Sequence, residues 1–86
     1  MPYNPAKFAE GTRVRIAARA VLEEFLRSWK LHNKLKQGQL PYAGQTAEVE
    51  KNYMYHGGYI LYELKGIPGL WHEQCLESAG EAAPKI

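Results

Sequence analysis

The stretch GIPGLWHEQCLE, residues 66–77, contains the signals that decide how this chain completes its fold. Its Ile67-Pro68-Gly69 segment is typical of a tight turn. Residues 70–72 have the composition of a short strand, and Leu76 is expected inside the fold beside Cys75. Because side chains alternate along a strand, Leu70 and Trp71 face opposite ways. We predict that Leu70 points into the core, which would turn Trp71 outward.

The segments before this stretch show the two-residue period of half-buried β-structure. Strands are predicted in residues 11–16, 46–51 and 59–65, with turns or loops at 39–45 and 53–58. The expected core-facing residues are Val14, Ile16, Ala47, Val49, Ile60, Tyr62 and Leu64. The 59–65 strand is apolar on most of its other face too, through Tyr59 and Leu61. Another element is therefore expected to cover that face.

The period changes between the first and second of these strands. Ala18, Leu22, Phe25 and Trp29 recur at helical spacing, which predicts an amphipathic helix over about 18–36. Acidic residues lie early in this helix and basic residues late, in the order that suits the helix dipole. The helix is expected to end near Gly38, because glycine is common just after the last residue of a helix.

Short strands, glycine turns and one helix after the first strand predict a small, mainly β barrel. Three groups of residues resemble the Src-homology-3-like barrel at the C-terminal end of the nitrile hydratase beta subunit. They are Phe8, Gly11, Val14 and Arg15; Leu40, Pro41 and Gly44; and Tyr62, Leu70, Trp71, Leu76 and Glu77. The resemblance implies a five-stranded barrel with an inserted helix, over residues 11–77. Residues 1–10 are expected to be a flexible arm and residues 78–86 a flexible tail.

Residues 11–15 and 76–77 also resemble, more distantly, the plasmid-borne type II dihydrofolate reductases, which are barrels of this size. Those enzymes use a Val-Gln-Ile-Tyr stretch around the pore of a tetramer, where this chain has Pro68-Gly69-Leu70-Trp71. The metal-binding cysteines of nitrile hydratase belong to its other subunit. Both resemblances therefore imply packing against another chain rather than catalysis. Small barrels of this type also resemble products of mobile gene cassettes.

Size and composition favour a small assembling protein. A domain of 86 residues buries a limited core, and oligomerisation is a common remedy. A single cysteine and the lack of a signal peptide or a membrane-length apolar run predict a soluble cytoplasmic protein. The net charge of +2 is permissive for nucleic-acid binding without indicating it.

We interpret the chain as a non-enzymatic module for protein–protein interaction or self-association. The expected surface consists of aromatic and apolar residues on the outer strand face and in the 53–58 loop: Trp71, Tyr59, Leu61, Tyr53, Tyr55 and His56. Two elements could cover this strand face: the inserted helix, through Phe25 and Trp29, or a second chain.

One alternative is nucleic-acid binding, with bases stacked on the tyrosine loop and phosphates bound by Arg27, Lys30, Lys34 and Lys36. Another is a small-molecule site at an oligomer interface. No catalytic residue or cofactor is predicted: His72 and Cys75 meet only if a 3₁₀ turn joins them, and no third group orients them. The three histidines are too widely spaced for a typical metal site.

Overall fold

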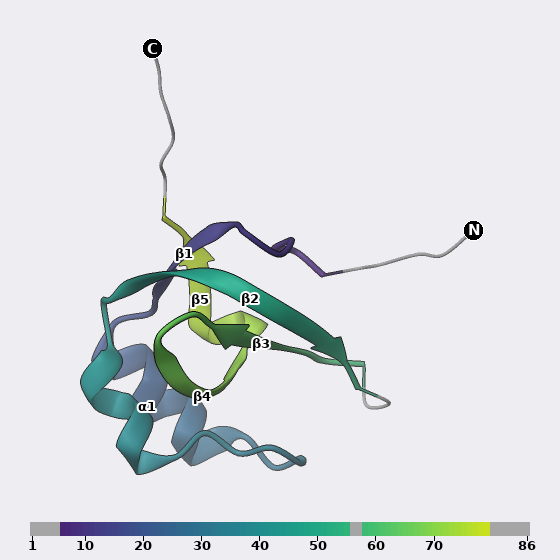
Figure 1. Cartoon of the computed structure of the whole chain (residues 1–86). Helices are drawn as coiled ribbons and strands as arrows, with labels where there is room; N and C mark the ends of the chain where they lie inside the picture. Colours follow the sequence, from purple (N-terminus) through teal and green to yellow (C-terminus); the bar gives the residue numbers. More distant parts are fainter. Residues whose placement is uncertain (1–5, 56–57, 80–86) are drawn as a thin grey trace.

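In the part of the chain that the structure describes, five antiparallel strands form one sheet, and a single α-helix is inserted after the first of them (Figure 1). The computed structural model describes residues 6–55 and 58–79. The strands are β1 (Arg13–Ile16), β2 (Thr46–Met54), β3 (Ile60–Leu64), β4 (Ile67–His72) and β5 (Leu76–Ser78). The helix α1 spans Arg19–Ser28, and two 3₁₀ helices, η1 and η2, span Gln37–Tyr42 and Glu73–Cys75. The predicted mainly β class and inserted helix are confirmed.

The strands lie in the order β4-β3-β2-β1-β5, so β4 and β5 are the outer strands. No ladder joins these two strands within the described residues, and the sheet is open rather than a closed barrel. The η2 turn carries the chain from β4 to β5, and its carbonyl at Cys75 accepts from the Ala17 N–H at 2.8 Å. The sequence left a 3₁₀ turn between His72 and Cys75 open as one of two possibilities, and this turn is present.

The core lies against one face of the sheet. The predicted core residues of β1, β2 and β3 are all buried: Val14, Ile16, Ala47, Val49, Ile60, Tyr62 and Leu64. Leu76 and Cys75 join them, as expected. Phe8 is also buried in this core, and its ring meets the Tyr62 ring edge-on at 5.6 Å. The packed part of the chain therefore includes residues before Gly11.

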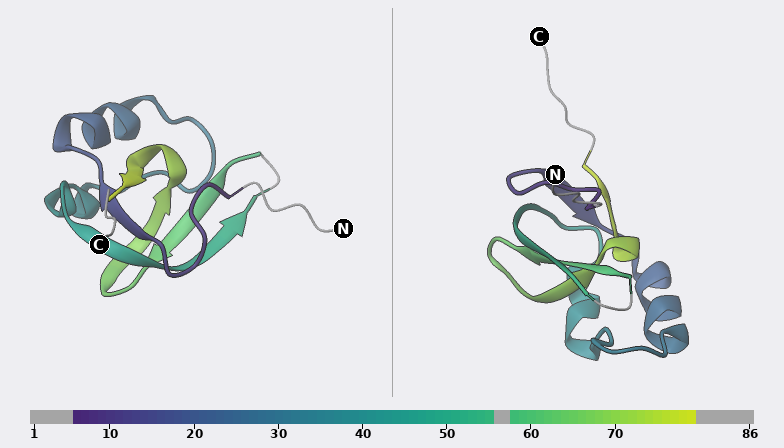
Figure 2. Two further views of the ribbon diagram at one scale, coloured as in Figure 1. Left: turned by 90° about the horizontal axis from the view of Figure 1, so that it is seen from above. Right: turned by 90° about the vertical axis from the view of Figure 1, so that its right-hand side faces the viewer.

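The helix is shorter than the predicted range of 18–36, because it ends at Ser28. Trp29 is extended at φ −73° and ψ 126°, and its indole Nε1–H donates to the carbonyl of His32 at 2.9 Å. The Trp29 ring packs against Tyr59 and His72, which takes the chain away from the helix axis. Residues 29–36 then cross to β4. The helix α1 and η1 lie side by side at one end of the sheet (Figures 1 and 2).

Two other predictions about the strands are wrong in detail. The turn before β4 is centred on Lys65-Gly66, with Gly66 at φ 79°, and Ile67 and Pro68 already belong to β4. The second strand continues through Tyr53 to Met54, where a loop was expected. The later part of β2 pairs with β3, from Val49 opposite Leu64 to Met54 opposite Ile60.

Trp71 faces the core, and the prediction that it points outward is wrong. It pairs with Tyr62 across β3 and β4, while Leu70 pairs with Glu63 and His72 with Leu61. Side chains directly opposite each other share a face of the sheet. Tyr62 is a core residue, so Trp71 is in the core too, and Leu70 is only half-buried on the other face. The alternation was right, but its phase is set by the register with β3.

Candidate binding groove

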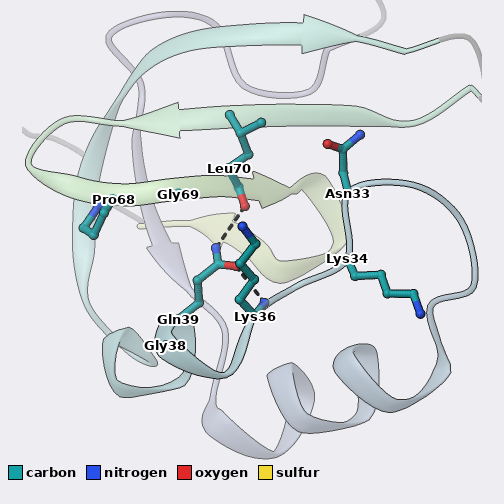
Figure 3. A pocket seen from close by; sticks show the side chains of 8 residues that line it. All are labelled: Asn33, Lys34, Lys36, Gly38, Gln39, Pro68, Gly69 and Leu70. Carbon is teal, nitrogen blue, oxygen red and sulfur yellow. Dashed lines mark hydrogen bonds between the residues drawn. The ribbon is translucent and has the colours of Figure 1, made fainter.

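A groove of about 620 Å³ runs between β4 and the segment that follows α1 (Figure 3). One wall is formed by residues 33–39 and the other by the first part of β4. The residues that line it are Asn33, Lys34, Lys36, Gly38, Gln39, Pro68, Gly69 and Leu70. The groove therefore lies along an outer strand of the sheet.

The carboxamide of Gln39 bridges the two walls. Its Nε2 donates to the carbonyl oxygen of Leu70 at 2.9 Å, and its Oε1 accepts from the backbone N–H of Lys36 at 2.9 Å. Both bonds are drawn in Figure 3, where the Leu70 carbonyl points away from β3 and toward η1. Gln39 is only 8% exposed, so its polar atoms need these partners.

Gly69 makes room for this bridge. It has φ +93°, a conformation that residues with a Cβ rarely adopt. A Cβ built on Gly69 would lie 3.0 Å from Gln39 Nε2, closer than ordinary contact allows. The backbone angle therefore favours glycine at this place, and a Cβ would also force the Gln39 carboxamide to shift.

The rim of the groove is basic. Lys34 and Lys36 are exposed on either side of Leu35, which is buried in the core and anchors the segment. Neither ammonium group forms an ion pair among the residues that the structure describes, and no carboxylate lines the groove. The whole sequence from residue 25 to residue 47 lacks Asp and Glu. An anionic ligand in the groove would therefore meet positive charges and no negatively charged side chain.

An aromatic cluster holds the far end of the same segment. The His72 ring lies 4.7 Å from Phe25, 4.5 Å from Trp29 and 5.4 Å from Tyr59, centroid to centroid. Burial lowers the pKa of His72, and its hydrogen bond to the Asn33 carbonyl partly offsets this. Asn33 sits at φ 61°, and its side-chain amide donates to the Tyr59 hydroxyl at 3.3 Å. Figure 3 shows Asn33 at this end of the groove.

The predicted interface residues do not form one exposed surface. Trp71 and Leu61 are completely buried, on opposite faces of the sheet. Tyr59 is half-buried under Trp29, so the inserted helix and the residue that ends it cover this part of the outer face. Of the two covers left open by the sequence, the chain itself therefore supplies one. The register of β3 and β4 is the reason that Trp71 is unavailable to a partner.

The tyrosines of the predicted loop interact mainly with each other and with an acid. The Tyr53 hydroxyl donates to Glu63 Oε1 at 2.9 Å, and the Tyr55 and Tyr59 rings stack at 5.5 Å. His56 lies outside the described residues. Neither Tyr53 nor Tyr55 lines the groove.

The four basic residues of the nucleic-acid alternative are also separated. Only Arg27 is helical, and it forms an ion pair with Glu24. Lys30 follows the helix and does not line the groove, whereas Lys34 and Lys36 do. The predicted basic helix end is therefore an irregular basic segment after the helix, with two lysines at the groove.

Cys75 is buried, and burial raises the pKa of its thiol to about 12, which makes a thiolate nucleophile unfavourable. Within residues 6–55 and 58–79, no three potential metal ligands cluster. No helix in the same ranges is long and apolar enough to cross a membrane.

Sequence reasoning missed Gln39, Asn33 and Gly69 as groove residues. Neither Asn nor Gln carries a charge or a spacing pattern that marks it, and Gly69 was assigned to a turn. No protein-family model matches this chain, and no curated protein matches its sequence.

Proposed function

We propose that this protein is a small non-enzymatic binding module whose groove binds an acidic segment of a partner protein. One observation carries the proposal. Lys34 and Lys36, which have no carboxylate partner within the described structure, lie beside the apolar residues Pro68 and Leu70 of an outer strand. Lysines at the rim attract carboxylates, and Pro68 and Leu70 offer apolar contact. Selectivity would come from this combination.

The groove favours a protein ligand over a nucleic acid. Binding of single strands relies on aromatic rings on which bases stack. No aromatic residue is among the described residues that line the groove, and Tyr53 of β2 is bonded to the carboxylate of Glu63. Self-association through Trp71 and Leu61 loses its support as well, because both residues are in the interior of one chain.

The proposal is tested by titrating the isotope-labelled protein with a short capped peptide of alternating Glu and Val residues, followed by amide chemical shifts. Shifts should concentrate on residues 33–39 and 67–70. The Lys34→Gln, Lys36→Gln double variant should bind the peptide about 2- to 30-fold more weakly, as expected for two exposed ion pairs. Salt should weaken binding to the wild type.

The matched control is Lys51→Gln, which removes an exposed lysine of β2 that does not line the groove. It should bind the peptide like the wild type. A loss per removed charge in Lys51→Gln as large as that in the double variant would show that overall charge, not the groove, attracts the peptide. Binding of oligothymidylate at the same residues, with no binding of the peptide, would overturn the proposal in favour of a nucleic-acid ligand.

A further inference from the structure

The Gln39 side chain makes the two hydrogen bonds that a peptide group would make in its place. A primary carboxamide has the same carbonyl acceptor and N–H donor as a main-chain amide. Here the acceptor takes the N–H of Lys36 and the donor reaches the carbonyl of Leu70, both at 2.9 Å. The groove thus already contains one peptide-like group, supplied by the chain itself.

The strand that receives this group is an outer one. β4 pairs with β3 on one side only, and its Leu70 carbonyl points toward the groove (Figure 3). Outer strands offer main-chain groups to which an extended peptide can add, and proteins often protect them with a side chain or a proline. Pro68, which has no N–H, stands two residues before Leu70 in β4.

We propose that the acidic ligand binds as an extended strand along β4, and that one of its peptide groups replaces the carboxamide of Gln39. This inference rests on the proposed function, because it takes the lysine-lined groove as the ligand site. In the free protein the Gln39 side chain occupies the hydrogen-bonding position of a neighbouring strand and so protects the edge of β4. In the complex, Leu70 accepts a hydrogen bond from the ligand main chain.

The charges of the groove fit a ligand in this conformation. Successive side chains of a strand point to opposite sides, and residues two apart lie roughly 6.6 Å from each other on one side. Carboxylates at alternate positions would therefore face the rim of Lys34 and Lys36, while the intervening apolar side chains meet Pro68 and Leu70. A ligand in a helical conformation would not place its peptide groups against Leu70, because its own turns already use them.

The first experiment measures the affinity of the Glu-Val peptide for Gln39→Ala, with Gln37→Ala as the matched control. Gln37 is exposed in the same 3₁₀ helix. Removal of the internal competitor should tighten binding about 2- to 10-fold in Gln39→Ala and leave Gln37→Ala unchanged. Weaker binding by a folded Gln39→Ala protein would show that Gln39 contacts the ligand directly, which overturns the replacement.

The second experiment keeps the wild-type protein and changes the ligand, so it does not depend on how the variant folds. Each peptide N–H of the Glu-Val probe is methylated in turn. At the position that faces Leu70, methylation should weaken binding about 5- to 150-fold, and neighbouring positions should be tolerated.

The outcomes separate this inference from the proposed function. Binding that depends on Lys34 and Lys36 but tolerates methylation everywhere keeps the groove as the site and overturns strand addition. Binding that ignores both lysines overturns the proposed function and this inference with it. Oligothymidylate binding in place of the peptide does the same.

Discussion

The imidazole Nε2 of His72 lies 2.6 Å from the carbonyl oxygen of Asn33 and ties the end of β4 to the segment that carries the groove lysines. A carbonyl only accepts hydrogen bonds, so Nε2 carries the proton in the neutral ring. The other nitrogen, Nδ1, is buried and has no hydrogen-bond partner within the described structure. The rings of Phe25, Trp29 and Tyr59 surround this neutral imidazole.

Protonation of His72 should therefore destabilise the fold. Burial lowers its pKa below the ordinary value of 6.5, so the unfolded chain binds the proton more readily than the folded one. The stability from the neutral ring is complete above 6.5 and is lost as pH falls from 6.5 through the lower folded pKa. Urea unfolding at a series of pH values from about 7.5 to about 5 measures this loss.

The variant His72→Phe should show a smaller decline over the same pH range, whatever its stability at neutral pH. His32→Gln is the control, because His32 is exposed and its removal should leave the decline unchanged. If His72→Phe and the wild type lose stability in parallel, another group controls the acid response.

Glycine positions in and near the groove should differ sharply in their tolerance of alanine. Gly69→Ala must hold a Cβ at φ +93° and push against Gln39 Nε2, so it should lower the free energy of unfolding by about 1–2 kcal/mol or more. Gly38→Ala should change it by less than about 1 kcal/mol, because Gly38 has no positive φ and its Cβ would meet nothing within 4 Å. Urea denaturation of both proteins gives the comparison. Equal effects would mean that the backbone at Gly69 relaxes freely.

The sequence predicted which helix and strands form. It predicted less well where they end and which side chains of the last long strand face the core. Alternation identified the buried sides of β1 and β2, because each of those strands has a polar face, and in β3 it grouped Ile60, Tyr62 and Leu64 on the core side although Leu61 on the other face is buried too. The 70–72 segment has a large side chain on each face, so alternation alone allowed two phases. The bulge between Glu63 and Leu64 and the turn at Gly66 decide which one pairs Trp71 with Tyr62. The bulge depends on how two strands pair, which alternation within one strand does not encode.

The groove was not predictable for a similar reason. Its lysines were singled out, but on a helix that was expected to continue to residue 36. Trp29 ends the helix by packing on His72, a contact between residues 43 positions apart that no local pattern encodes. The bridge from Gln39 to Leu70 joins residues 31 positions apart and is equally invisible to periodicity.

Cys75 should be protected from thiol reagents in the folded protein. It is completely buried in the η2 turn, and burial raises its pKa to about 12, so almost no thiolate exists at neutral pH. A chromogenic disulfide reagent should label it only as fast as the protein opens, and at once in concentrated urea. Rapid labelling of the native protein would show that the turn between β4 and β5 opens readily.

The Tyr62 hydroxyl should contribute more stability than the other acid-bonded tyrosine. It donates to Glu73 Oε2 at 2.5 Å and accepts from the backbone N–H of Phe8 at 3.2 Å, linking β3 to the segment before β1. Tyr62→Phe would leave the buried Phe8 N–H without its acceptor, which should cost about 1–3 kcal/mol in urea denaturation. Tyr53→Phe removes only the bond to Glu63 and should cost less than about 1 kcal/mol.

Alkaline titration gives a second test of the same hydroxyl. Burial, followed by the hydrogen bond to Glu73, raises the pKa of Tyr62 from 10.0 to about 12. The unfolded chain then loses this proton first, so the stability from Tyr62 is complete below 10.0 and is lost as pH rises toward 12. The stability difference between wild type and Tyr62→Phe should narrow over that range. A constant difference would show that Tyr62 ionises as readily in the folded protein as in the unfolded chain, and that Glu73 does not hold its proton.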